Sequence, residues 1–228
     1  MPRKGHISRR RINPDGVYNS DLVVKFINSL MYGGKKSAAP TTSTDASGCA
    51  VVTAPTPAAR TAPKPTSTLS ATKTYTLTFE TNCGTFVVTL DQKQSPNTAA
   101  SLVSLVQKGF FNNTVFHRIV PGFVIQGGDP TQTGTSGPGY STVDKPPATA
   151  RYTHGVVAMA KTGADPAGTA GSQFFIVTAA DAQLPPDYAI VGTVTKGLDV
   201  VDRIGTLGDA SEQPTEVVEI TKVTVGES

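Results

Sequence analysis

Cysteine and histidine, the residues that most often bind zinc, are scarce in this sequence, and tryptophan is missing. Its 228 residues include no tryptophan, two cysteines and three histidines, and the spacing of Cys49 and Cys83 fits no zinc-binding pattern. The glycine-rich segment 134–139 matches neither a dinucleotide-binding fingerprint nor a P-loop, and no G-x-S-x-G elbow marks a hydrolase. We therefore expect no metal site, no cofactor and no hydrolytic chemistry.

Long apolar runs are also missing. No stretch of about 18 apolar residues occurs, so the sequence predicts no membrane-spanning helix. No apolar region of about 7–15 residues follows the charged N-terminus, which argues against a signal peptide. We expect a cytoplasmic location for the chain as given, or export if the natural start differs. Two free thiols are the simpler expectation in a reducing compartment, whereas export would allow a Cys49–Cys83 disulfide that ties the linker to the domain.

Positive charge is concentrated at the N-terminus. Residues 1–37 hold eight Lys or Arg against two Asp or Glu, although the whole chain carries a net charge of only +3. Residues 1–11 form a basic arm, and a short helix is predicted after Ser20, which is a good N-cap residue. The apolar residues of this helix repeat at helical spacing: Val23, Phe26, Ile27 and Leu30.

This head resembles the start of the bacterial small-subunit ribosomal protein seven. The similarity lies in residues 1–5, 20–23, 25–28 and 34–37, and the helical body of that family does not follow. The resemblance implies a weak contact with nucleic-acid phosphates, because Lys and Arg neutralise phosphates without needing a fold. The alternative is a fusion or start-site remnant that has no function.

Residues 38–72 differ from both neighbours in composition. They consist mainly of Ala, Pro, Thr and Ser and contain little that could be buried. The segment is therefore predicted to be a disordered, extended linker between the head and a globular domain at 73–226.

The pattern of the globular domain is that of a mainly β fold. Tyr75, Leu77 and Phe79 alternate with polar residues, and a second alternating run after Gly84 completes a predicted hairpin. Ser95-Pro96 opens a predicted helix, with Ser95 as the N-cap. Further strands are predicted near 155–160, 172–177, 190–194 and 217–225, with a second short helix near 198–204. Many short strands and two helices predict a closed antiparallel barrel whose ends the helices cover.

The stretch 116–129 carries the most specific chemistry. Arg118, Phe123 and Gln126 place a permanent cation, an aromatic ring and an amide within nine residues. This combination suits recognition of a carbonyl group on an apolar ligand. An equally good interpretation is a buried strand whose arginine pairs with a nearby carboxylate.

Several motifs in the domain resemble the cyclophilin-type peptidyl-prolyl isomerases. They are the runs 116–123 and 126–129 and the run 171–175, in an order and spacing that hold over about residues 74–226. The resemblance implies a closed eight-stranded barrel with two helices, a groove on its outer face, and proline-containing polypeptides as partners. It also implies an enzyme that assists protein folding, which we expect to be a monomer. The alternative is a chaperone module that binds proline peptides with little turnover.

The resemblance also assigns roles to individual residues. Arg118 corresponds to the catalytic arginine, acting with Phe123 and Gln126. The implied substrate-binding residues are Val124, Gly134, Ala160, Lys161, Thr162, Gln173, Phe175, Gln183, Leu184 and Tyr188. Lys161 stands where asparagine is frequent, a difference that matters little if its backbone does the binding. Gln183 and Tyr188 stand where tryptophan and histidine are common.

Overall fold

The computed structural model describes residues 47–228, so the basic arm, the predicted N-terminal helix and the first part of the linker lie outside it. No helix in the described part is long and apolar enough to cross a membrane. The elements, in chain order, are β1 Tyr75–Thr81, β2 Gly84–Leu90, α2 Pro96–Gln107, β3 Thr114–Val115, β4 Arg118–Val120, β5 Val124–Gly127, β6 Thr142–Val143, β7 Val156–Met159, β8 Thr169–Ala170, β9 Phe174–Val177, β10 Ile190–Lys196, α3 Leu198–Gly205 and β11 Glu219–Glu227.

The first hairpin confirms the alternating pattern read from the sequence. The apolar residues of β1 point inward, and Phe79 on β1 pairs with Phe86 on β2. Their rings stack at a centroid distance of 4.8 Å. Side chains directly opposite each other on antiparallel strands share a face, so this pairing commits one face of the hairpin to the core.

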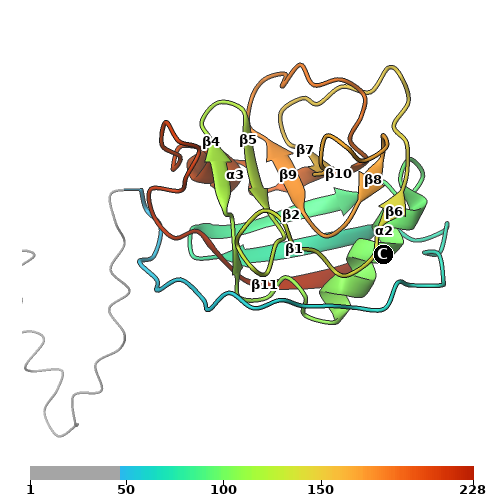
Figure 1. Cartoon of the computed structure of the whole chain (residues 1–228), viewed down its shortest axis with the longest axis horizontal. Helices are drawn as coiled ribbons and strands as arrows, with labels where there is room; N and C mark the ends of the chain where they lie inside the picture. The colour runs from blue at the N-terminus through green and yellow to red at the C-terminus, as the bar shows by residue number, and fades with distance from the viewer. Residues whose placement is uncertain (1–46) are drawn as a thin grey trace, which may run out of the picture. The chain divides into compact units, whose positions relative to one another are not determined.

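Most of the strands form one antiparallel sheet, and this sheet is open, not closed. Nine strands follow the order β3-β11-β1-β2-β10-β7-β9-β5-β4, and β6 and β8 form a separate pair. The prediction of a closed eight-stranded barrel is therefore wrong in detail, although the mainly β fold with two helices is confirmed. Strand patterns fix which residues face inward, but they do not fix whether two short edge strands bond to each other. Figure 1 shows the curled sheet with α2 and α3 at opposite ends.

Helix α2 is capped by a residue from another element. Ser95 occupies the N-cap position, but its hydroxyl donates to the carbonyl of Ile190 at 2.6 Å. The carboxylate of Asp144 accepts hydrogen bonds from the N–H of Thr98 at 2.7 Å and of Asn97 at 3.4 Å. The prediction of Ser95 as the N-cap residue, with Pro96 in the first turn, is confirmed. The buried Asp144 carboxylate, and not the Ser95 side chain, accepts from the free N–H groups and suits the positive end of the helix.

The segment 47–72, which we call the strap, is not a free linker. Its backbone lies against the domain, and Figure 1 shows it as the blue-to-cyan trace along one side. Cys49 forms a disulfide with Cys83 in the β1–β2 turn, so the expectation of two free thiols is wrong. The prediction of a disordered linker is wrong over 47–72 as well, because composition shows how little the strap can bury but not how many hydrogen bonds it makes.

Candidate functional site

Sheet register places Arg118, Gln126 and Phe175 in one row. Arg118 on β4 pairs with Gln126 on β5, which pairs with Phe175 on β9. Residues directly opposite one another point to the same face, and here it is the outer face of the sheet. The intervening residues Ile119 and Ile125 point inward and are fully buried in the core.

The outer face carries a cavity of about 230 Å³, which we call the apolar cavity after the five aromatic and aliphatic side chains in its walls. Phe123, Val124, Phe175, Leu184 and Tyr188 supply its apolar walls. The other residues that line it are Arg118, Gln126, Ala160 and Lys161. The Arg118 cation and the Gln126 amide therefore line the same cavity as several aromatic and aliphatic side chains.

Two neighbours fix the guanidinium of Arg118. Its Nε donates to Oε2 of Glu212 at 2.6 Å, and its Nη1 donates to Oε1 of Gln126 at 3.2 Å. The Arg118 side chain is 33% exposed, so it is neither buried in the core nor free in solvent. The two sequence interpretations are thus combined, since Arg118 pairs with a carboxylate and also faces an apolar cavity.

Tyr152 packs against the aromatic side chains that form one wall of the apolar cavity. The rings of Phe175 and Tyr188 meet edge to face at 5.5 Å, and Tyr152 contacts both. The fully buried Tyr152 hydroxyl donates to the carbonyl of Tyr188 at 2.7 Å and accepts from its N–H at 3.0 Å. Burial, as the largest cause, raises the pKa of Tyr152, so this hydroxyl stays neutral and keeps its proton for that bond.

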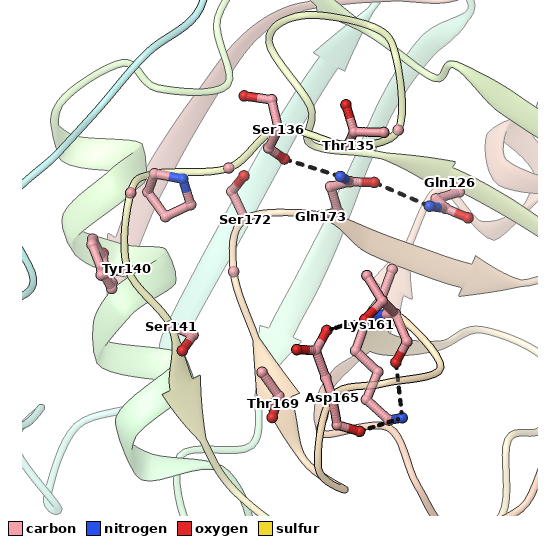
Figure 2. A pocket seen from close by; sticks show the side chains of 17 residues that line it. Gln126, Thr135, Ser136, Tyr140, Ser141, Lys161, Asp165, Thr169, Ser172 and Gln173 are labelled. Carbon is pink, nitrogen blue, oxygen red and sulfur yellow. Dashed lines mark hydrogen bonds between the residues drawn. The ribbon is translucent and has the colours of Figure 1, made fainter.

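A second cavity of about 370 Å³ adjoins the first, and we call it the polar cavity because most of the residues that line it carry polar side chains. The two cavities share Gln126, Ala160 and Lys161. One wall is the loop 134–141, and the other is formed by residues 160–162 and 171–173. Figure 2 shows the amide of Gln173 between this loop and Gln126. Gln173 Nε2 donates to the carbonyl of Ser136 at 2.9 Å, and Gln126 Nε2 donates to Gln173 Oε1 at 3.2 Å.

Lys161 contributes its side chain as well as its backbone. Its Nζ lies 2.6 Å from Oδ2 of Asp187 and 5.5 Å from the ring centroid of Tyr188. The same Nζ donates to the carbonyls of Thr162 and Asp165. The side chain is only 4% exposed, so these partners hold it within the wall of the site, and the pairing of its backbone with a peptide stays a prediction. Lys161 connects the boundary between the two cavities to the aromatic wall.

The glycines of the 126–129 motif allow a close approach of backbone. A Cβ at Gly128, where φ is +87°, would meet the carbonyl oxygen of Ser172. Asp129 follows and is fully buried, and its carboxylate accepts from the N–H groups of Thr131, Thr135 and Ser136. Burial alone would raise the pKa of Asp129, but hydrogen bonds from the hydroxyl and N–H of Thr131 and from the N–H of Ser136 outweigh it and hold the pKa below its ordinary value.

His117 does not belong to the site, although it precedes Arg118. It lines a separate cavity with Phe116 and Gln132, and neither of its ring nitrogens has a hydrogen-bond partner among the described residues. Burial lowers the pKa of His117, so it remains neutral and adds no second cation beside Arg118.

The structure brings together all the predicted site residues except one. Each of them lines the apolar or the polar cavity, but Gln183 lies outside both and lines a neighbouring hollow with Arg151 and Asp181. Sequence reasoning missed Glu212, Tyr152 and Asp187, which no local motif marks. Asp129 had a signal, since it ends the 126–129 motif, but it was given no role.

Comparison with known families agrees with this geometry. A family model described as cyclophilin type peptidyl-prolyl cis-trans isomerase/CLD matches residues 76–225. A second model, described as ribosomal protein S7p/S5e, matches residues 2–50, in line with the resemblance of the head.

Individual relatives match the same region. The peptidyl-prolyl cis-trans isomerase-like 1 of Emericella nidulans is 36% identical over 157 residues, which are 67% of this chain and 95% of the relative. A crystal structure of a cyclophilin type isomerase from Cryptosporidium parvum is similar with a TM-score of 0.62 and 31% identity, covering 67% of this chain and 98% of that one. A second structure of that protein, in the presence of the dipeptide Ala-Pro, gives a TM-score of 0.61 at the same identity, over 66% of this chain and 98% of the other.

Proposed function

Because the chain belongs to the cyclophilin-type peptidyl-prolyl cis-trans isomerases, we propose that it is an active isomerase (EC 5.2.1.8) whose apolar cavity holds the proline ring of a polypeptide. The observation that carries this proposal is that the Arg118 guanidinium lines the same small cavity as Phe123, Phe175 and Leu184. The Ala-Pro dipeptide used with the Cryptosporidium relative supports a proline-containing ligand.

The reaction requires no covalent chemistry. Rotation about an Xaa–Pro bond faces a barrier of about 18–20 kcal/mol, because amide resonance must be broken. Uncatalysed exchange takes tens to hundreds of seconds. A rate of about 10³ per second therefore requires a barrier lower by roughly 6–7 kcal/mol.

Arg118 is the residue placed to lower that barrier. In the twisted transition state the proline nitrogen becomes pyramidal and regains its lone pair. A guanidinium N–H can donate to this nitrogen in the twisted state but not in the planar ground state, where the lone pair is delocalised into the carbonyl, so the interaction favours the transition state. Because Glu212 and Gln126 hold the Nε and Nη1 of Arg118, the group is oriented before substrate arrives.

The walls of the apolar cavity perform a separate task. Phe123, Phe175 and Leu184 contact the proline ring and exclude water, which would otherwise weaken the Arg118 interaction. Gln126 and Gln173, held by Ser136, present amide groups to the substrate backbone. Together these groups keep the ring fixed while the carbonyl on the other side of the bond rotates.

Replacing the cation tests the mechanism. We expect Arg118→Ala to fold normally and to lose about 10²- to 10³-fold in kcat/KM, since one preorganised donor is removed. The assay follows cis-to-trans conversion of a proline peptide, with thermal unfolding as a check. Arg151→Ala serves as a matched control, because Arg151 is an exposed arginine that also pairs with a carboxylate, Asp181. Unchanged turnover in Arg118→Ala would refute the mechanism.

The same assay separates an enzyme from a binding module. A non-catalytic module would bind proline peptides without accelerating the exchange, and Arg118→Ala would then alter only the dissociation constant. We expect acceleration by the unmodified protein, at a rate that scales with its concentration.

We also propose that the chain acts in an oxidising compartment. The Cys49–Cys83 disulfide supports export over the cytoplasm, since disulfides persist where the glutathione system does not reduce them. Alkylation of free thiols in intact cells, followed by mass measurement, tests the proposal. Full alkylation of both cysteines would contradict it.

A further inference from the structure

We propose that the strap (47–72) is a positioning element for substrate recognition, which braces the loop 130–141 against the polar cavity with Arg60 as its anchor. The strap lies outside the region matched by the isomerase family, which begins at residue 76. The inference rests on the proposed proline-peptide site and concerns the part of a peptide that extends beyond the proline ring.

The strap follows the loop along its length. Four hydrogen bonds join the two segments: Gln132 Nε2 to the Pro55 carbonyl at 2.8 Å, Ala58 N–H to the Pro130 carbonyl at 3.1 Å, Ala62 N–H to the Pro138 carbonyl at 3.0 Å, and Lys64 Nζ to the Ser141 carbonyl at 2.9 Å. Contacts towards both ends of the loop restrict where residues 133–137 between them can lie, whereas a single contact would fix only one point.

Arg60 anchors the strap between two of these contacts. Its Nη1 donates to the carbonyls of Phe110 at 2.6 Å, Asn112 at 2.8 Å and Gly109 at 3.4 Å. These carbonyls follow the C-terminal end of α2, whose last turn contains no basic residue. A helix C-terminus carries partial negative charge, so the guanidinium supplied by the strap is favourable there.

The start of the strap is fixed independently. Cys49 is covalently joined to Cys83, and the adjacent Ala50 exchanges two hydrogen bonds with Asn82, each at 2.8 Å. The strap is therefore held at the β1–β2 turn and again at the end of α2. The loop 130–141 lies against residues 55–64 of the strap, on both sides of Arg60.

The braced loop connects directly to the catalytic groups. The carbonyl of Ser136 accepts from Gln173, Gln173 accepts from Gln126, and Gln126 accepts from Arg118. Figure 2 shows the first two of these contacts at the edge of the polar cavity. A shift of the loop at Ser136 would therefore displace the amides that hold the substrate backbone.

The composition of the loop explains why bracing is needed. Gly134, Gly137 and Gly139 all lie in the wall of the polar cavity, and glycine has more backbone freedom than any other residue. A loop that is ordered only when peptide binds loses that freedom at the cost of affinity. A strap that orders the loop beforehand lowers this cost for peptides long enough to reach the polar cavity.

The test compares short and long substrates in the full chain. We expect Arg60→Ala to raise KM about five- to tenfold for a proline peptide extended by three residues on each side of the Xaa–Pro pair. KM for a blocked Xaa–Pro dipeptide should change less than about twofold, and kcat for both should be retained. Arg60→Lys should recover most of the effect, because an ammonium keeps the positive charge and offers three N–H donors to these carbonyls.

Hydrogen exchange of the free protein provides a second, substrate-independent readout. In Arg60→Ala the amides of Thr135 and Ser136 should exchange several-fold faster, while the amides of β1 and β2 stay protected. Lys64→Ala, which removes an exposed contact to the same loop, should act in the same direction if Arg60→Ala fails to fold.

The outcomes are distinguishable. An equal rise of KM for short and long peptides, or unchanged exchange at Thr135 and Ser136, would overturn the positioning role of the strap. An inactive unmodified protein would refute the isomerase assignment, but the exchange measurement would still decide whether the strap braces the loop.

Discussion

Arg118 depends on a carboxylate that lies 94 residues further along the chain. Glu212 sits in a turn with φ of +64°, and the carboxylate of Asp209 holds this turn by accepting from the N–H groups of Ser211 and Gln213. The carbonyl of Glu212 also accepts from the N–H of Ile119, the neighbour of Arg118. The turn therefore delivers the carboxylate to the guanidinium in a fixed position.

Removing this carboxylate should impair turnover more than binding. With Glu212→Ala we expect kcat to fall about tenfold, because Arg118 loses its Nε partner and samples other rotamers. KM should change little, since the apolar walls remain. Glu212→Gln keeps an oxygen acceptor for Nε and should recover most of the rate. The two parameters are measured separately, and an unchanged kcat in Glu212→Ala would show that Gln126 alone orients the arginine.

Residues within the motifs could be predicted and their distant partners could not. Arg118, Phe123 and Phe175 were identified because their order along the chain resembles a known family. Glu212 and Asp187 are carboxylates without a local signature, and the fold alone brings them to Arg118 and Lys161. Gln183 is the reverse case: the resemblance to the family assigned it to the substrate-binding residues, but its side chain lines a neighbouring hollow and not the apolar cavity.

At the scale of elements, the loop after Asp129 is more ordered than its composition indicates. The sequence predicted a surface loop from the abundance of Gly, Pro and Thr. The structure shows one buried carboxylate that collects several N–H and O–H donors from this loop. Glycine content predicts freedom of the backbone, but it does not reveal the buried acceptor that restricts this freedom together with the strap.

This buried carboxylate should make stability depend on acid pH. The pKa of Asp129 is lower in the folded chain than its ordinary value of 3.8, so its stabilising contribution is fully present above about pH 4. The contribution is lost as the pH falls from there through the folded pKa. Asp129→Asn should cost about 2 kcal/mol at neutral pH, because an amide nitrogen replaces one acceptor oxygen.

Denaturant unfolding from pH 7 to pH 2 measures this contribution. The unmodified protein should lose more stability than Asp129→Asn across the acid range, so the two curves should converge at low pH. Other depressed carboxylates such as Asp165 and Asp181 are common to both proteins and cancel in the comparison. Parallel curves would contradict the role given to Asp129.

At the scale of the whole molecule, the disulfide joins the strap to the sheet. It closes a loop with a sequence separation of 34 residues, for which chain entropy predicts about 3–4 kcal/mol of stabilisation. We expect the free energy of unfolding of Cys49→Ala/Cys83→Ala to be lower by this amount, so that the variant unfolds at a lower denaturant concentration. The reduced unmodified protein should have the same midpoint as the variant. Equal midpoints for oxidised and reduced protein would show that the bridge adds nothing to stability.

The architecture was predictable because alternation and helical spacing are strong signals in this domain. The hairpin 75–90, the helix after Ser95 and the later strands all appear where the pattern indicated. The strap was not predictable, because its contacts are made by backbone groups and by Arg60, and such contacts leave no periodic trace. The open sheet was missed for a similar reason, since closure depends on two very short strands.

Those two strands have a consequence for the proposed isomerase activity on other polypeptides. β3 and β4 are the edges of the sheet, they are two and three residues long, and only Phe116 and His117 separate them in the chain. A long unprotected edge would recruit extended polypeptides as additional strands and promote aggregation. Because both edge strands are short and adjacent in the chain, a substrate peptide cannot pair with them as an additional strand. It can therefore dissociate after its Xaa–Pro bond has isomerised.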